Sequence, residues 1–322
     1  MRNYRLMINK LRTQLHIVPL VFLLALALTG CGKKVPPSQR ETEVKLENQA
    51  GTWSNDFDIL LPKISDEPTD GNEYLSFDAT YAEDGYICIR YLGDAEKAKL
   101  QLFKDTSITY TYNIPPDEDT IIPLSLGSGI YSITIYENIQ SNEYAMIYAT
   151  DLEVSLKDEL SPFLYPNQYV NFSDKSDTTA LARQLTDGCG NELDAVAKVY
   201  DYMIKNITYD YDKAENVQPG YLPDVDEILS IKTGICFDYS AVMTAMLRSV
   251  GIPTRMEIGY SGDAYHAWLS VYVKDIGWIN DIIQFDGNVW TLMDPTFDAN
   301  ADGNTSLIGS GKKTEYTMMY NY

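Results

Sequence analysis

A cysteine and a histidine in the second half of the chain are suited to nucleophilic chemistry. Cys236 follows a glycine and precedes an apolar run with helical spacing, so we expect its sulfur at or near the N-terminus of a buried helix. The positive end of a helix dipole and a nearby imidazolium both favour the reactive thiolate. Of the two histidines, His16 lies in the leader, so His266 is the candidate partner.

An acid that holds the second imidazole nitrogen would complete such a site. Asp294, in an Asp-Pro-Thr string at the end of a predicted strand, is placed for this role, and Asp281 on the strand after His266 is a competitor. Each residue alone has a plainer explanation, as a small buried apolar residue, a structural histidine or a turn former. Only the combination favours catalysis.

The elements that must position these residues follow from periodicity. Helical spacing predicts helices over 177–186, 191–207, 225–231 and 236–250, with Gly251 and Pro253 ending the last one. Residues 208–232 otherwise have the composition of an irregular loop. Alternation predicts strands over 254–260, 265–273, 278–283 and 289–293, with His266 and Trp268 on one face of the second strand.

The preceding part of the chain has a different pattern. Short alternating runs separated by turn residues predict strands over 86–91, 99–103, 129–136 and 144–156. This spacing is typical of an all-β sandwich of immunoglobulin-like size. No catalytic constellation lies within it, so we expect a spacer or a binding module.

The chain begins with a segment typical of export. Basic residues precede a short apolar stretch over 17–28, which ends in Leu28-Thr29-Gly30-Cys31. This string resembles the bacterial lipobox, which predicts a signal peptide over 1–30 and a lipidated Cys31. The alternatives are an ordinary signal peptide and an anchor that is never cleaved. Lipidation would make the membrane a partner and place the chain on the cell membrane, facing outside the cytoplasm. Residues 31–70 would be the lipidated cysteine and a flexible tether.

Composition excludes several classes of function. The net charge of -21 disfavours binding to a phosphate backbone, so no nucleic-acid partner is expected. Four cysteines without a CxxC pair and so few histidines predict no metal and no cofactor. Residues 298–303 resemble the front of a calcium loop, but Gly309 stands where the motif needs Glu, so a polar turn is expected. Spacing does not support a Cys88–Cys189 disulfide.

Four strings identify a family by resemblance. They are G234-I-C-F-D-Y-S240, G251-I-P-T-R255, H266-A-W268 and D294-P-T296. Together they resemble the transglutaminase-like superfamily over about residues 190–300, which implies an α+β, papain-like fold. We expect this domain over 161–322, preceded by the β-sandwich over 71–160. The resemblance implies that Cys236 is the nucleophile, His266 the general base and acid, and Asp294 the orienting acid.

The resemblance also implies an activity. Cys236 would attack an amide carbonyl, and its own backbone N–H would help to stabilise the oxyanion. Tyr209 is a candidate for the second donor, although the chain has many tyrosines with structural roles. We expect an enzyme that is hydrolytic, in the manner of a protease or amidase, on peptide, protein or cell-wall material. The alternatives are a protein cross-linking transglutaminase and a non-catalytic surface binding module.

Overall fold

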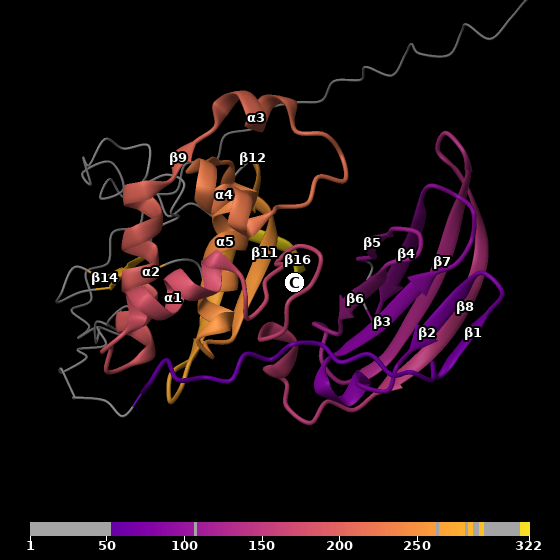
Figure 1. Ribbon diagram of the computed structural model, residues 1–322, viewed down its shortest axis with the longest axis horizontal. Helices are drawn as coiled ribbons and strands as arrows, with labels where there is room; N and C mark the ends of the chain where they lie inside the picture. Colours follow the sequence, from indigo (N-terminus) through magenta and orange to yellow (C-terminus); the bar gives the residue numbers. More distant parts are fainter. Residues whose placement is uncertain (1–52, 106–107, 262–263, 281–282, 286–289, 293–315) are drawn as a thin grey trace, which may run out of the picture. The chain divides into compact units, whose positions relative to one another are not determined.

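The computed structural model describes residues 53–105, 108–261, 264–280, 283–285, 290–292 and 316–322 (Figure 1). The chain is α+β, as predicted. Strands fill the first part, and helices appear from residue 177 onward, followed by a second group of strands. Among the described residues, no helix has the length and apolar character needed to cross a membrane.

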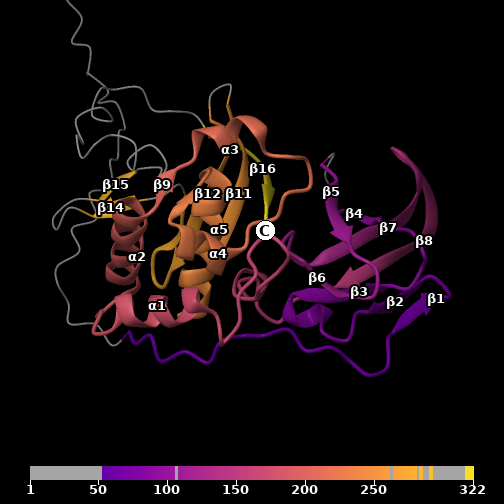
Figure 2. The ribbon, with the colours of Figure 1, turned by 45° about the horizontal axis from the view of Figure 1, so that its top comes forward.

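The first part contains two antiparallel sheets of four strands (Figure 2). Their orders are β1-β2-β3-β6 and β5-β4-β7-β8. The bounds of the first sheet are β1 Asp70–Asn72, β2 Leu75–Asp78, β3 Tyr86–Tyr91 and β6 Asp119–Pro123. Those of the second are β4 Ala98–Phe103, β5 Tyr110–Ile114, β7 Gly129–Gln140 and β8 Glu143–Val154. Short 3-10 turns lie at Ala82–Asp84 and Ser161–Phe163. The immunoglobulin-like character of this part stays a prediction.

Alternation explains why these segments form strands. Every second residue of β4 and β5 is buried, and the residues between them are half-buried or exposed. Apolar side chains from both sheets, among them Ile89, Leu100 and Ile135, are fully buried in a hydrophobic cluster. A period of two is what a sheet with one covered face requires.

Five helices are described in the second part. They are α1 Asp177–Thr186, α2 Glu192–Asn206, α3 Tyr211–Asn216, α4 Val225–Ile231 and α5 Cys236–Ser249. Side-chain caps begin three of them: Asn191 precedes α2, Asp210 precedes α3 and Asp224 precedes α4. Helix α3 lies where the sequence predicted only an irregular loop.

Helix α5 is the central helix of this part. All its residues from Asp238 to Ser249 are buried, and it lies against β11 and β12 (Figures 1 and 2). It ends before Gly251, which has a φ of 83° and donates its N–H to the carbonyl of Arg248. A Cβ at Gly251 would lie 2.8 Å from the ring of Phe57, so glycine is required there for both reasons.

The helices accompany a third antiparallel sheet of four strands, ordered β13-β12-β11-β16. Its strands are β11 Thr254–Ser261, β12 Ala264–Val273, β13 Gly277–Ile279 and β16 Tyr316–Asn321. Two small pairs complete the fold: β9 Thr208–Tyr209 with β10 Thr233–Gly234, and β14 Ile283–Phe285 with β15 Trp290–Leu292. Strand β13 is shorter than predicted, and no pattern in the sequence predicted β16.

Asn321 of β16 and the following Tyr322 contact residues of the β-rich part. The Tyr110 hydroxyl of β5 bonds both the side chain and the N–H of Asn321, at 3.2 Å each. The Ser125 hydroxyl donates to the Asn321 carbonyl at 2.9 Å. The ring of Tyr322 packs against Tyr110 and Tyr112. The β-rich part therefore contributes directly to the packing around β16, which is more than a spacer would do.

Candidate active site

Cys236 is the first residue of α5, and its side chain is half-buried. The two residues of β10 lead toward it and pair in parallel with β9. In this short ladder Thr233 lies opposite Thr208, and Gly234 lies opposite Tyr209. The pairing fixes the backbone before Cys236 and places Tyr209 on the neighbouring strand.

Helix α5 itself anchors β9. The Tyr239 hydroxyl donates to the carbonyl of Ile207, the residue just before β9. Beyond the strand, the Asp210 N–H donates to the Gly234 carbonyl at 2.9 Å. Tyr239 is fully buried, so this connection is shielded from water. The start of α5 and the strand that carries Tyr209 are thus held together at both ends.

Asp238 closes the first turn of α5. Its Oδ2 accepts the N–H of Ile235 at 2.8 Å, which satisfies a donor that the helix leaves free. Gly234 makes room for this carboxylate, because a Cβ there would lie 2.6 Å from the Cβ of Asp238. The glycine before the cysteine is therefore explained by the close approach of Asp238.

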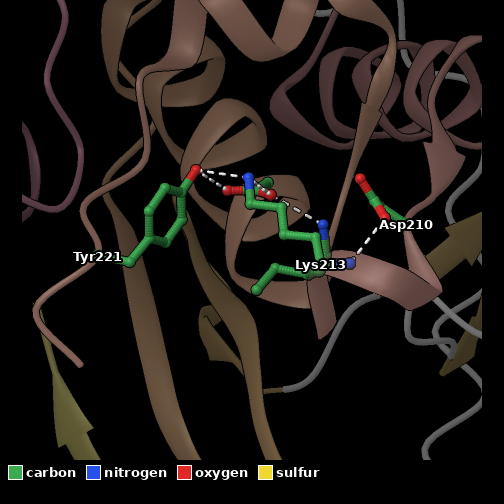
Figure 3. Close-up of polar contacts among 5 residues, drawn as sticks. Asp210, Lys213 and Tyr221 are labelled. Carbon is green, nitrogen blue, oxygen red and sulfur yellow. Dashed lines mark hydrogen bonds and ion pairs between the residues drawn. The ribbon is translucent and has the colours of Figure 1, made fainter. Parts of the chain in front are cut away.

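The Asp238 carboxylate has two further partners (Figure 3). Lys213 of α3 donates from Nζ to Oδ2 at 2.6 Å, and Tyr221 donates its hydroxyl to Oδ1 at 2.7 Å. Burial, and after it the hydrogen bond to Asp238, raises the pKa of Tyr221, so this tyrosine remains a neutral donor. We call Lys213, Tyr221 and Asp238 the Asp238 cluster.

His266 lies on β12, opposite Gly259 of β11. It is 9% exposed, and its ring stacks on Trp268 with the ring centroids 6.4 Å apart. Trp268 follows two residues later on the strand, where side chains return to the same face. The position of His266 is thus set by the register of two paired strands and by an aromatic neighbour.

A groove of about 1830 Å³ borders the start of α5. Cys236, His266 and Tyr209 all line it. Residues of the β-rich part line it as well, including Thr111 and Asn113 of β5. The groove is thus bordered by both parts of the chain and contains a thiol, an imidazole and a phenol.

Several predicted residues lie outside the described part of the chain. They are Asp294, its competitor Asp281, the lipobox cysteine Cys31 and the polar stretch over 298–303. Their roles stay predictions.

The other two described cysteines differ from Cys236 in setting. Cys88 is 3% exposed, and burial raises its pKa to about 12. Cys189 is half-buried, and burial followed by the charge of Asp194 raises its pKa. Cys88, Cys189 and Cys236 are all free thiols. Cys236 is the one that begins a helix and borders the groove.

Sequence reasoning missed the Asp238 cluster. An acid at the third position of a helix is a recognisable capping signal, and Asp238 stands three residues after Ile235. The partners Lys213 and Tyr221 come from a segment that appeared irregular. No local pattern indicates that they reach Asp238, because α3 was not predicted.

Comparison with known proteins gives matches for the part of the chain that holds this site. Residues 179–281 match the sequence model of the transglutaminase-like superfamily. A protein of Bacillus subtilis (strain 168), the uncharacterized protein YebA, is 28% identical over 154 residues. That match covers 39% of this chain and 20% of YebA, so the chain spans about a fifth of the length of this relative.

Solved structures of other proteins also match this chain. A protein of Cytophaga hutchinsonii, named as a candidate cysteine protease, is 15% identical with a TM-score of 0.36, over 74% of this chain and 83% of its own. Red sea bream transglutaminase is 14% identical with a TM-score of 0.29, over 68% of this chain and 49% of its own.

Proposed function

We propose that the chain is a thiol enzyme that acts on amide bonds through Cys236, because residues 179–281 match the sequence model of the transglutaminase-like superfamily. The observation that carries the proposal is the groove in which Cys236, at the start of a buried helix, and His266 are both found. A helix N-terminus favours the thiolate, and an imidazole that lines the same groove supports the proton transfers that thiol acyl transfer needs.

The reaction proceeds in two steps. The Cys236 thiolate attacks the carbonyl carbon of an amide, and the C–N bond breaks as the thioester forms. His266 gives the proton that the leaving amine needs. Water then attacks the thioester, with His266 taking one of its protons, which releases the acid and restores the Cys236 thiolate and protonated His266.

Two further roles complete the mechanism. Asp294 would hold the His266 ring in the tautomer that can receive a proton from the thiol. The backbone N–H of Cys236 and the Tyr209 hydroxyl would stabilise the oxyanion of each step. Tyr209 is supported by its position opposite Gly234, two residues before the nucleophile.

We further propose that the enzyme is exported and held to the membrane by lipid on Cys31, facing outside the cytoplasm. The apolar stretch that ends in Leu28-Thr29-Gly30-Cys31 supports this. The substrate would then be peptide, protein or cell-wall material. Replacing Cys31 with Ser should leave the full-length protein without lipid, whereas a soluble mature protein with an unmodified Cys31 would contradict the proposal.

An activity-based experiment tests the chemistry. The purified protein is incubated with a peptide library and a small primary amine in oxygen-labelled water, and products are identified by mass spectrometry. Hydrolysis puts the label in a new carboxylate, whereas cross-linking gives an amide of the added amine. Either product must disappear in Cys236→Ala. A product that persists in this variant would exclude Cys236 as the nucleophile.

A further inference from the structure

We propose that Lys213 is a positioning residue that neutralises the buried Asp238 carboxylate, so that Asp238 can cap α5 without opposing formation of the Cys236 thiolate. This inference rests on the proposed function of Cys236 as a nucleophile. It concerns a residue of α3, a helix that the family motifs do not include.

The charge of the Asp238 carboxylate affects both the stability of α5 and the ionisation of a thiol in its first turn. Asp238 is fully buried and stands two residues after Cys236 in the same first turn of α5. An acid in this turn stabilises the helix, because it satisfies a free N–H and interacts with the positive end of the dipole. The same negative charge disfavours a second anion nearby, and burial weakens the screening by water.

Lys213 compensates the negative charge of Asp238 through short contacts. Its Nζ lies 2.6 Å from Oδ2 of Asp238 and 2.7 Å from the Tyr221 hydroxyl. It also lies over the Tyr221 ring, 4.2 Å from the centroid. The ammonium thus makes three contacts with two residues, and only 25% of the lysine side chain is exposed. Because the Lys213 ammonium offsets the Asp238 carboxylate, the net charge at the first turn of α5 is close to zero.

Hydrogen bonds of Asp210 hold the backbone around Lys213 in place. Asp210 begins α3, and its Oδ1 accepts the Lys213 N–H at 2.8 Å (Figure 3). The Asp210 N–H in turn bonds Gly234, two residues before Cys236. The helix that supplies the cation is therefore tied to the strand that leads into the thiol.

The cluster also shapes the groove. Tyr221 belongs to the connection between α3 and α4, and it lines the groove beside Cys236. Its ring packs against Phe237, the residue that follows the cysteine. Lys213 and Asp238 hold the Tyr221 hydroxyl from both sides, so the charge pair fixes this wall of the groove as well.

Other ionisable groups near Cys236 are unchanged in the test below. Several ionisable residues on neighbouring elements border the groove. They are Tyr209 of β9, Tyr265 and His266 of β12, Tyr169 of the connection before α1, Asp224 and Asp226 of the α4 region, and Tyr320 and Tyr322 at the chain end. Asp210 caps α3, where its Oδ1 accepts the Lys213 N–H. Because these groups are retained in every variant, differences in pH dependence report on Lys213 and Asp238.

The test compares the wild type with Lys213→Met and with the double variant Lys213→Met/Asp238→Asn. The rate of iodoacetamide labelling at Cys236 is followed from pH 5 to 10 by peptide mass spectrometry. Lys213→Met should move the half-maximal pH upward by about 1 unit, which corresponds to about tenfold slower labelling at neutral pH. The double variant should return it to within about 0.3 unit of the wild type, because the uncompensated charge is gone.

Lys205→Met is the matched control. Lys205 forms an exposed ion pair with Asp201 on α2, so the variant makes the same change in net charge away from the cluster. It should label like the wild type. If Lys213→Met unfolds, the double variant should restore folding together with the wild-type pH profile.

The outcomes separate this inference from the proposed function. A Lys213→Met profile equal to that of the wild type would overturn the inference, and so would a double variant that is unfolded or labels no faster than Lys213→Met. If Lys213 had only a structural role, the double variant would be unfolded or would label no faster than Lys213→Met. Labelling of wild-type Cys236 no faster than that of Cys189 would instead count against Cys236 as an activated nucleophile.

Discussion

Tyr209 and Gly234 lie directly opposite each other in the parallel β9–β10 ladder, so the phenol and the nucleophile are held by adjoining backbone segments. Two anchors maintain this relationship: the hydrogen bond from Tyr239 to Ile207 and the one from Asp210 to Gly234. The anchors hold the backbone of Tyr209 beside that of Gly234, and a preorganised donor is the condition for strong stabilisation of an oxyanion, the role proposed for the Tyr209 hydroxyl.

Replacing Tyr209 with Phe tests this role. The variant should fold like the wild type and lower kcat by roughly 10²–10³-fold with little change in KM, because the hydroxyl acts in the transition state. Tyr211→Phe is a matched control, since Tyr211 is a neighbouring tyrosine that is 62% exposed. Equal turnover by Tyr209→Phe and the wild type would assign the second oxyanion donor to another residue.

The orienting acid is tested by two conservative variants. Asp294→Asn should preserve the fold and reduce turnover by about 10²–10⁴-fold, since the His266 ring would lose the partner that sets its tautomer. Asp281→Asn should have a much smaller effect. Turnover measurements that give the reverse ranking would transfer the role to Asp281 while leaving Cys236 and His266 in place.

Arg248 is predicted to be a main determinant of stability. It is fully buried and donates to the carbonyls of Tyr165, Thr254 and Tyr322, so it connects the end of α5 to the start of β11 and to two residues far away in the sequence. Arg248→Met should lower the free energy of unfolding by about 3–5 kcal/mol, because three carbonyls lose a charged donor.

Denaturant titration followed by circular dichroism measures this loss. Arg183→Met serves as the control, since Arg183 is exposed and donates to one carbonyl, that of Phe57. A loss for Arg248→Met no larger than that for Arg183→Met would show that the buried arginine is dispensable.

The junction between the β-rich part and β16 should also contribute to stability. Asn321→Ala removes the side-chain bond to Tyr110, and we expect a loss of about 1–3 kcal/mol in the free energy of unfolding. Tyr74→Phe, at a tyrosine that is 40% exposed, is a control within the β-rich part. Thermal melts of both variants would detect the difference. An unchanged melting temperature for Asn321→Ala would mean that the two parts are stable without this contact.

The sequence predicted the elements whose signals are local. Helix α5 follows from apolar periodicity ended by Gly251 and Pro253, and β12 follows from alternation around His266. The helix over Asp177–Thr186 agrees residue for residue with its prediction. The family motifs led to Cys236 and His266, and both residues border one groove.

The elements that the sequence missed depend on distant partners. Strand β16 is a short run rich in tyrosine and methionine, and it pairs with β11 far earlier in the chain. Helix α3 has no buried residue, so it lacks the apolar stripe by which helices are recognised. The bond from Lys213 to Asp238 joins residues that no spacing rule connects.

Cys236 is proposed to be an activated nucleophile, and relative alkylation rates of the cysteines test this proposal. The native protein is treated with iodoacetamide at neutral pH, and labelling of each cysteine is followed by mass spectrometry. Burial raises the pKa of Cys88 to about 12 and also raises that of Cys189, so both thiols keep their protons under these conditions. We predict that Cys236 labels at least about tenfold faster than Cys189, and that Cys88 labels only after unfolding. Equal rates for Cys236 and Cys189 in the folded protein would contradict the account.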